Sequence, residues 1–337
     1  MIASTDQVPA DLVSLRRRLH AHPELSGAER QTAALIAAEL RELQPELLLE
    51  GLGGTGVAAV FDSGRAGPGV LFRAELDALP IEEFNDFEYR STIERVSHKC
   101  GHDGHMAVLL GLARAMARRR PARGRVVTLF QPAEETGAGA VQVLEDPRFQ
   151  EIRPDYAFAF HNLPGYPLGA VVNKAGAFTA GVRSLIIRLQ GMTSHAAEPE
   201  HGVNPALALA DLLQLAERLT QPNSSRPDFT LVTPVYATLG ERAYGVSAGA
   251  GEVHFTIRCW SREMMEQLAG DLLHLTETIV RNHGLEYDTE WTNIFYANFN
   301  DADAVNVIRE AALDNGLLHL ERREPLKWGE DFGAFSQ

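Results

Sequence analysis

Three short apolar segments run directly into acidic or imidazole side chains, and this pattern constrains the fold more than any other feature of the chain. Residues 70–74 lead to Glu75 and Asp77, residues 126–130 to Glu134 and Glu135, and residues 156–160 to His161. Nearly continuous apolar runs of this length are typical of strands buried on both faces. With a similar run at 57–61, they predict an α/β sheet that helices cover on both sides.

The polar residues at the ends of these strands predict where a site lies. In an open α/β sheet, ligands bind beyond the carboxyl ends of the strands. Three separate segments therefore deliver carboxylates and an imidazole to one edge of the sheet. This convergence indicates a functional site without reference to any known protein.

Helices are predicted around these strands from apolar periodicity and from end signals. The first covers Leu12–Leu19. Ser26 and Glu29 have the spacing of a capping box, which predicts that a second helix starts there and continues to about Leu43. A third helix is predicted over His105–Met116.

The middle of the chain has a different pattern, with strands that alternate in polarity. Two helices, near 205–219 and 262–283, alternate with four strands near 185–189, 229–238, 251–259 and 285–291. The order β-α-β-β-α-β is that of the ferredoxin-like unit. Because 337 residues exceed one typical core, we expect a first domain of residues 1–177 and 293–337, with residues 178–292 inserted as a second.

The composition excludes some classes of function. The 31 basic and 45 acidic residues give a formal net charge of -14, the opposite of what a nucleic-acid partner requires. No segment resembles a signal peptide or a membrane span, so no membrane partner is expected. The two cysteines, Cys100 and Cys259, lie far apart, which suits a reducing cytoplasm. We expect Cys259 in the core of a strand.

The segment Cys100-Gly-His102-Asp-Gly-His105 has the strongest metal-binding character. Glycine lets the loop bend so that a thiolate and an imidazole turn toward one ion, and Cys, His and carboxylate ligands together suit zinc or another divalent transition metal. The alternatives are that Cys100 is a small buried hydrophobic residue and that Asp103 and His105 cap a helix. The polar residues at the three strand ends favour the metal site.

The adjacent Glu134 and Glu135 can have two different chemical roles. Neighbouring side chains at a strand end point in different directions, so one carboxylate can bind metal while the other removes a proton from a water that the metal activates. The alternative is a pair of solvated glutamates in a turn, which the preceding apolar strand disfavours.

Seven segments, in order along nearly the whole chain, resemble the M20 metallopeptidase family, and specifically its amidohydrolase branch. They are Leu19-His-Ala-His-Pro-Glu-Leu-Ser26, Arg73-Ala-Glu-Leu-Asp-Ala-Leu-Pro80, Cys100-Gly-His-Asp-Gly-His105, Gln131-Pro-Ala-Glu-Glu135, His161-Asn-Leu-Pro164, Ser194-His-Ala-Ala197 and Glu330-Asp-Phe332. One such segment is weak support, whereas seven in the same order are very specific.

The resemblance implies a zinc-peptidase-like catalytic α/β domain that holds two divalent metal ions. At the matched positions, Cys100, His102, Glu135 and His161 are metal ligands and Glu134 is the general base. The metals implied are zinc, manganese, cobalt or nickel.

The resemblance also implies that the ferredoxin-like domain is a lid through which the protein forms a homodimer. His195 matches a histidine that stabilises the tetrahedral oxyanion, although spacing alone makes it a loop histidine. Arg258 and Asn204 are assigned to substrate binding, although spacing alone makes Arg258 an outward-facing strand residue.

Two segments depart from the family pattern. Family members continue past the Glu-Asp-Phe motif to a further metal-binding histidine, whereas this sequence ends at Gln337. We therefore expect either an incomplete sequence or a metal pair with one ligand fewer. Residues 244–251 lack the Asn-x-Ile-Pro pattern expected in the lid, which affects substrate contacts more than the type of reaction.

The sequence thus predicts a cytoplasmic enzyme that hydrolyses the amide bond of an N-acyl amino acid or a similar small amide. One alternative is a dipeptidase or carboxypeptidase with the same residues. The other is a non-catalytic, dimeric binding protein of the same fold that lacks the last metal ligand.

Overall fold

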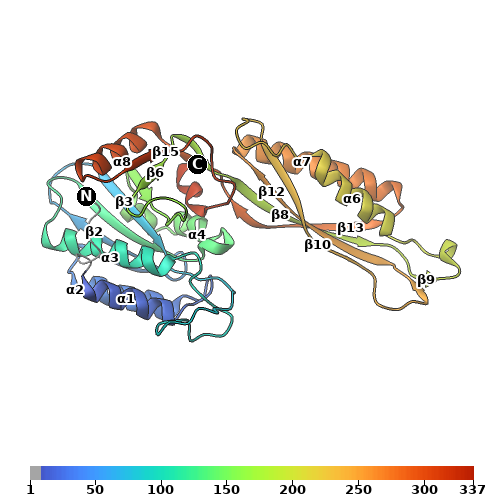
Figure 1. The fold of residues 1–337 in the computed structure, drawn as a ribbon, viewed down its shortest axis with the longest axis horizontal. Coiled ribbons are helices and arrows are strands. Elements are labelled where there is room, and N and C mark those ends of the chain that lie inside the picture. Colours follow the sequence, from blue (N-terminus) through green and yellow to red (C-terminus); the bar gives the residue numbers. More distant parts are fainter. Residues whose placement is uncertain (1–8) are drawn as a thin grey trace. The chain divides into compact units, whose positions relative to one another are not determined.

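The computed structural model describes residues 9–337, so residues 1–8, with which the predicted catalytic domain begins, lie outside the described residues. The described chain forms two compact units with mixed α/β structure (Figure 1). The first unit contains 9–173, Asp301–Glu321 and Ala334–Gln337, and the second contains Lys174–Asn300 and Arg322–Gly333.

The first unit is built on a five-stranded sheet with the strand order β1-β2-β4-β3-β5. Its strands are β1 (Leu47–Leu52), β2 (Gly56–Asp62), β3 (Gly69–Glu75), β4 (Arg125–Gln131) and β5 (Tyr156–Ala159). β3 runs parallel to both β4 and β5, whereas β2 is antiparallel to β4 and to β1. The carboxyl ends of β3, β4 and β5 therefore meet at one edge, as the sequence predicts.

Helices cover both faces of this sheet (Figure 1). α1 (Ala10–Ala21), α2 (Arg30–Glu42) and α3 (His102–Arg118) share one apolar core with the sheet, and α4 (Gly139–Glu145) and α5 (Phe149–Ile152) share another. β2 contributes to both cores: Val57, Ala59 and Phe61 pack in the first, and Ala58 and Val60 in the second. This alternation explains why the strand is apolar throughout.

The predicted capping box is wrong. α2 begins at Arg30 with Glu29 as its N-cap residue, and the Glu29 side chain makes no capping hydrogen bond. The Glu24 carboxylate instead accepts from Gln31 N at 3.2 Å and from Thr32 N at 2.8 Å in the first turn. Ser26 instead donates its hydroxyl to Asp77 Oδ2 at 2.7 Å, and the Glu29 carboxylate is completely buried in other contacts. Spacing alone cannot distinguish a capping pair from two polar residues that are used in tertiary contacts.

Two other expectations need correction. α3 begins at His102, three residues before the predicted start, because Gly101 adopts a left-handed conformation (φ 94°) that allows the chain to enter the helix directly. The predicted buried strand at 156–160 is only partly buried: Tyr156 is 45% exposed and Phe160 is 40% exposed. β5 is the edge strand of the sheet, so it pairs with β3 alone and no strand lies along its other side.

Short elements complete the first unit. β6 (Val171–Asn173) pairs in parallel with β15 (His319–Glu321), and α8 (Ala302–Asp314) lies between them in the chain. His319 Nε2 and Asn173 Oδ1 are 2.8 Å apart across this pair. His319 therefore has a local structural partner.

The second unit contains a four-stranded antiparallel sheet with the strand order β10-β12-β8-β13. In chain order the elements are β8 (Gly181–Gln190), α6 (Ala206–Arg218), β10 (Thr230–Leu239), β12 (Ala250–Cys259), α7 (Arg262–Asn282) and β13 (Glu286–Phe295). Side chains of the sheet and of both helices form one apolar core, which includes the fully buried Cys259 as predicted. Two further pairs are β9 (Ser194–His195) with β11 (Val246–Ser247) and β7 (Gly176–Thr179) with β14 (Asn298–Asn300).

The segment 322–333, which the sequence analysis assigns to the first domain, groups with the second unit. Leu326 donates its N–H to Phe178 O at 2.7 Å and accepts from Ala180 N at 3.0 Å, so it continues the backbone pairing of the second unit. Among residues 9–337, no helix is both long enough and apolar enough to cross a lipid bilayer.

Candidate metal centre

Three of the predicted ligands come together at the N-terminal end of α3. One donor atom each from Cys100, His102 and His161 lies within 4.8 Å of the other two. Cys100 and His102 flank the left-handed Gly101, and His161 follows β5 across the sheet edge. The loop and the strand end thus place a sulfur and two imidazoles around one point, as the sequence predicts.

Glu134 and Glu135 lie at the same place, in a short 3-10 turn (Glu134–Thr136) after β4. His102 Nε2 is 3.8 Å from Glu134 Oε2 and 3.8 Å from Glu135 Oε1. The expectation that the two carboxylates point in different directions is therefore wrong. A strand would send adjacent side chains to opposite faces, but the turn directs both toward His102.

The ring of His102 is held with Nε2 toward these residues. Its Nδ1 donates to Asp77 O at 2.8 Å, and Asp77 Oδ1 is 3.4 Å away. Its Nε2 is buried and makes no hydrogen bond among the residues that the structure describes. An imidazole fixed by a carbonyl at one nitrogen, with the other nitrogen facing a thiol and carboxylates, has the arrangement of a metal ligand. The residues present therefore fit a divalent transition metal.

The charges at this centre couple metal binding to proton release. Burial lowers the pKa of His102, but the Glu75 charge and the hydrogen bond to Asp77 outweigh it and raise this pKa well above its usual value. The nearby His102 imidazole lowers the pKa of the Cys100 thiol, but burial and the Glu135 charge raise it overall. Metal binding requires a neutral imidazole and a thiolate, so a bound cation displaces protons from both groups.

A buried chain of polar residues, for which the sequence predicts no particular role, lies beside the candidate ligands. Glu75 Oε2 accepts from His105 Nδ1 at 2.7 Å, and His105 Nε2 accepts from the Asn162 N–H at 3.1 Å. The chain thus connects the end of β3 to the residue after His161. Glu75 and His105 lie in two of the quoted motifs, and helix capping is the alternative that the sequence leaves open for His105. Their polar character beside buried strands was the available signal.

A second buried network supports the loop that leads from β3 to Cys100. His20 of α1 places Nδ1 2.9 Å from Asp103 Oδ2 and Nε2 3.1 Å from Glu83 Oε2. Glu83 also accepts from Lys99 Nζ at 2.7 Å and from Ser91 N at 2.8 Å. Because Lys99 precedes Cys100 and Asp103 follows His102, both ends of the candidate ligand loop are anchored to α1.

We expect Glu83 to stabilise the protein in a pH-dependent way. Burial raises its pKa, but the hydrogen bonds from Lys99 and the Ser91 N–H outweigh it and lower the pKa from 4.5 to about 2. A depressed folded-state pKa contributes stability above the unfolded value of 4.5, and this contribution is lost as the pH falls toward 2. Glu83→Gln should therefore reduce the free energy of unfolding by about 1–3 kcal/mol at pH 7.

Urea unfolding of wild type and Glu83→Gln between pH 7 and pH 3 measures this difference. The two curves should approach each other as the pH falls below about 4.5. Glu82→Gln, at the neighbouring position, is the matched control. A difference that does not change across this range would contradict the role of the Glu83 charge.

The remaining predicted residues lie in the second unit. His195 is exposed in β9, where its Nδ1 accepts from Ala197 N at 3.1 Å. Asn204 donates to Ser247 Oγ at 3.0 Å, and Ser247 pairs with Ser194 beside His195. These two residues therefore share one end of the unit.

Arg258 lies in β12, at the opposite end of the four-stranded sheet of this unit. It is opposite Val182 in β8, and its Nη1 donates to Lys327 O at 2.8 Å. From Val182 to Gln190, the end of β8 that leads to His195, eight residue steps at roughly 3.3 Å each span about 26 Å. Arg258 and His195 of one chain are therefore too far apart to contact the same small molecule.

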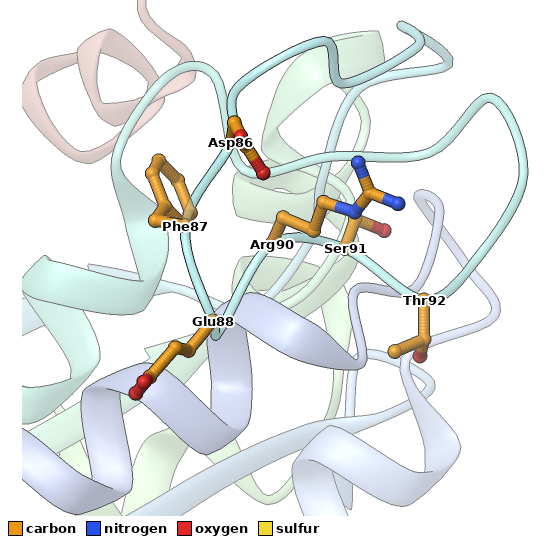
Figure 2. A pocket seen from close by; sticks show the side chains of 6 residues that line it. All are labelled: Asp86, Phe87, Glu88, Arg90, Ser91 and Thr92. Atoms are coloured by element: carbon orange, nitrogen blue, oxygen red, sulfur yellow. The ribbon is translucent and has the colours of Figure 1, made fainter.

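A separate pocket of about 680 Å³ lies outside this centre (Figure 2). Six residues of a single loop line it: Asp86, Phe87, Glu88, Arg90, Ser91 and Thr92. None of the predicted site residues is among them. The pocket therefore gives no support to the metal centre, and we assign it no role.

The fold and the centre define a class of protein. One edge of the sheet presents a thiol, two imidazoles and two adjacent glutamates, and the chain also has a second α/β unit. Such a set of donors beside possible general bases is typical of metal-dependent hydrolases. The model of Peptidase family M20/M25/M40 matches residues 71–337, and the chain belongs to this family.

Individual relatives agree with this assignment. The chain is 32% identical over 325 residues to N-acetyldiaminopimelate deacetylase of Anoxybacillus flavithermus, covering 95% of this chain and 84% of that protein. It is 30% identical to hippurate hydrolase of Campylobacter jejuni, covering 96% and 84%. The crystal structure of the YXEP protein of Bacillus subtilis, described as a dinuclear metal binding peptidase from the M20 family, has a TM-score of 0.80 at 29% identity, covering 97% and 85%.

Proposed function

We propose that this protein hydrolyses the amide bond of N-acyl amino acids or similar small amides, using two divalent metal ions. The observation that carries the proposal is the convergence of Cys100, His102, His161 and the Glu134–Glu135 turn at one sheet edge. The names of the two relatives above give an N-acetylated amino acid and hippurate as substrates, and both are N-acyl amino acids.

Cys100, His102, Glu135 and His161 would hold the metal ions. Sulfur, imidazole and carboxylate donors suit zinc, and also manganese, cobalt or nickel. When bound, the ions supply Lewis-acid polarisation of the substrate carbonyl and make water easier to deprotonate.

Glu134 would act as the general base. Its side chain is buried (5% exposed) and lies beside His102, so its carboxylate can hold the attacking water in a fixed orientation. It would accept a proton as the water oxygen bonds to the amide carbon. It would then give a proton to the amine nitrogen as the carbon–nitrogen bond breaks.

The second unit would serve as a ferredoxin-like lid and dimerisation domain. Its β-α-β-β-α-β element order and its separate core support this role, and the predicted boundaries 178 and 292 fall within Lys174–Asn300. The first unit would be the catalytic domain. Two free thiols, Cys100 and Cys259, suit a reducing compartment, which supports a cytoplasmic location.

Formation of a homodimer would allow His195 and Arg258 to act on one substrate although they lie at opposite ends of the lid. If both residues act on one substrate, they must come from two chains, because about 26 Å of strand separates their ends of β8 at roughly 3.3 Å per residue. His195, which would donate to the developing oxyanion, would then complete the site of the partner chain, and Arg258 and Asn204 would contact substrate.

Complementation tests this arrangement. Glu134→Ala and His195→Ala should each be inactive alone, whereas a mixture refolded together should regain activity. A mixed dimer contains one site with both an intact Glu134 and an intact partner His195. No recovery in a mixture shown to contain mixed dimers would mean that His195 acts within its own chain.

Metal content and substrate choice test the function itself. Purified protein should contain about two divalent ions per chain and should hydrolyse N-acetyl and N-benzoyl amino acids faster than dipeptides. A strong preference for dipeptides would favour the peptidase alternative. Protein that binds no divalent metal and hydrolyses neither class of substrate would overturn the proposal.

A further inference from the structure

We infer that Glu29 is a positioning residue for the turn that carries Glu134 and Glu135, an inference that rests on the proposed function of these two residues. Glu29 precedes α2 and has a completely buried side chain. Its Oε1 atom accepts from Ala133 N at 2.9 Å, across 104 positions of sequence, and from Gly27 N at 2.7 Å. Its Oε2 atom accepts from Thr55 Oγ1 at 2.8 Å.

The hydrogen bond from Ala133 N–H to Glu29 is important because the backbone of Ala133 is strained. It has φ 51° and ψ 39°, in the left-handed region that residues with a side chain rarely adopt. Such a conformation persists only where the surroundings hold it in place. Ala133 is buried (4% exposed), so its N–H would have no water to bond if the Glu29 carboxylate were absent.

The other groups of the turn are held as well. Ala133 O accepts from Gly139 N at 3.1 Å, and Glu135 N donates to Asp77 Oδ2 at 2.9 Å. Asp77 in turn accepts from Ser26 Oγ at 2.7 Å. Two buried carboxylates therefore hold two N–H groups of one turn, and both are connected to the segment from Ser26 to Glu29.

Glu29 acts through the backbone and touches neither substrate nor metal. By holding the N–H of Ala133 it keeps this residue left-handed, which sets the direction in which the chain enters the Glu134–Thr136 turn. Both glutamates then lie 3.8 Å from His102 Nε2. If Ala133 relaxed toward the common right-handed region, Glu134 would move relative to the ligands, and a displacement of about 1 Å can reduce a rate by roughly 100-fold.

The test compares three variants that differ in which hydrogen bond they remove. Glu29→Ala removes the acceptor for Ala133 N–H and should lower kcat roughly 10- to 100-fold with KM changed less than about threefold. Glu29→Gln keeps an oxygen for Ala133 N–H, and its amide can donate to Thr55 Oγ1, so kcat should stay within about threefold of wild type. Thr55→Val removes only the bond to Oε2 and is the matched control, with kcat within about twofold.

A double variant separates positioning from a general loss of structure. Glycine adopts left-handed backbone without strain, so Ala133→Gly should reduce the dependence on Glu29. The loss of kcat caused by Glu29→Ala should be at least about threefold smaller in the Ala133→Gly background than in wild type. Equal losses in the two backgrounds, or a Glu29→Gln variant as slow as Glu29→Ala, would overturn the inference.

Hydrogen exchange of the Ala133 amide gives a readout that does not depend on any substrate. Glu29→Ala should speed exchange at this amide at least about tenfold relative to Glu29→Gln, while the amides of β4 keep their wild-type rates. Unchanged exchange at Ala133 would contradict the inference. If wild type hydrolyses no N-acyl amino acid, the proposed function fails, and the exchange experiment still decides whether Glu29 holds the turn.

Discussion

Glu134→Gln should lower kcat for N-acyl amino acid hydrolysis roughly 10²- to 10⁴-fold, the usual contribution of a general base, without loss of bound metal. The substitution keeps the size of the side chain but removes the group that accepts the proton. Because Cys100, His102, Glu135 and His161 are unchanged, metal content measured by atomic spectroscopy should equal that of wild type.

The control is Glu151→Gln, which neutralises an exposed glutamate of the same unit and should leave kcat unchanged. A Glu134→Gln variant that lost its metal would assign Glu134 to metal binding rather than to proton transfer. A variant with full activity and full metal content would show that another group removes the proton.

Arg73→Met should reduce the free energy of unfolding by about 3–5 kcal/mol, the cost of leaving a buried charge without its partner. Arg73 is the largest completely buried side chain of the described chain. It forms an ion pair with Glu75, which is also completely buried, and donates from Nε to Gln131 Oε1 at 2.9 Å. Burial raises the pKa of Glu75, but the Arg73 guanidinium outweighs it and holds this pKa well below its usual value.

Chemical denaturation of the single and double variants measures this effect. Arg73→Met combined with Glu75→Gln should be less destabilised than Arg73→Met alone, because the unpaired carboxylate is removed. Arg281→Met breaks an exposed pair with Glu277 in α7 and should cost no more than about 0.5 kcal/mol. A loss below about 1 kcal/mol for Arg73→Met would mean that His105 or water compensates Glu75.

Periodicity and strand-end position allowed much of the first unit to be predicted from sequence. β3 and β4 lie where short apolar runs end in carboxylates, and their parallel pairing is consistent with the helix between them, α3. Partial burial of β5 could not be predicted, because an edge strand and a central strand can have the same composition. The exposure of Tyr156 depends on which strands neighbour it, and the sequence does not state this order.

Residues around the candidate ligands were harder to assign than the ligands themselves. Cys100, His102 and His161 combine a residue type and a position that suggest metal binding. Ser26 and Glu29 have equally polar side chains, but their partners, Asp77 and Ala133, lie far away in sequence. The spacing of Ser26 and Glu29 favours a capping box, because a prediction from spacing uses only neighbours along the chain. The actual contacts of these two residues depend on the packing of α2 against the sheet.

We expect the parallel pairs of β3 with β4 and β5 to form late in folding. Each parallel pair joins segments that are distant in sequence, and long loops close slowly because of their entropy. We therefore expect His161 to reach His102 only after β5 has joined β3. Metal would bind to a sheet edge that is already complete, so it should slow unfolding while leaving the rate of refolding nearly unchanged.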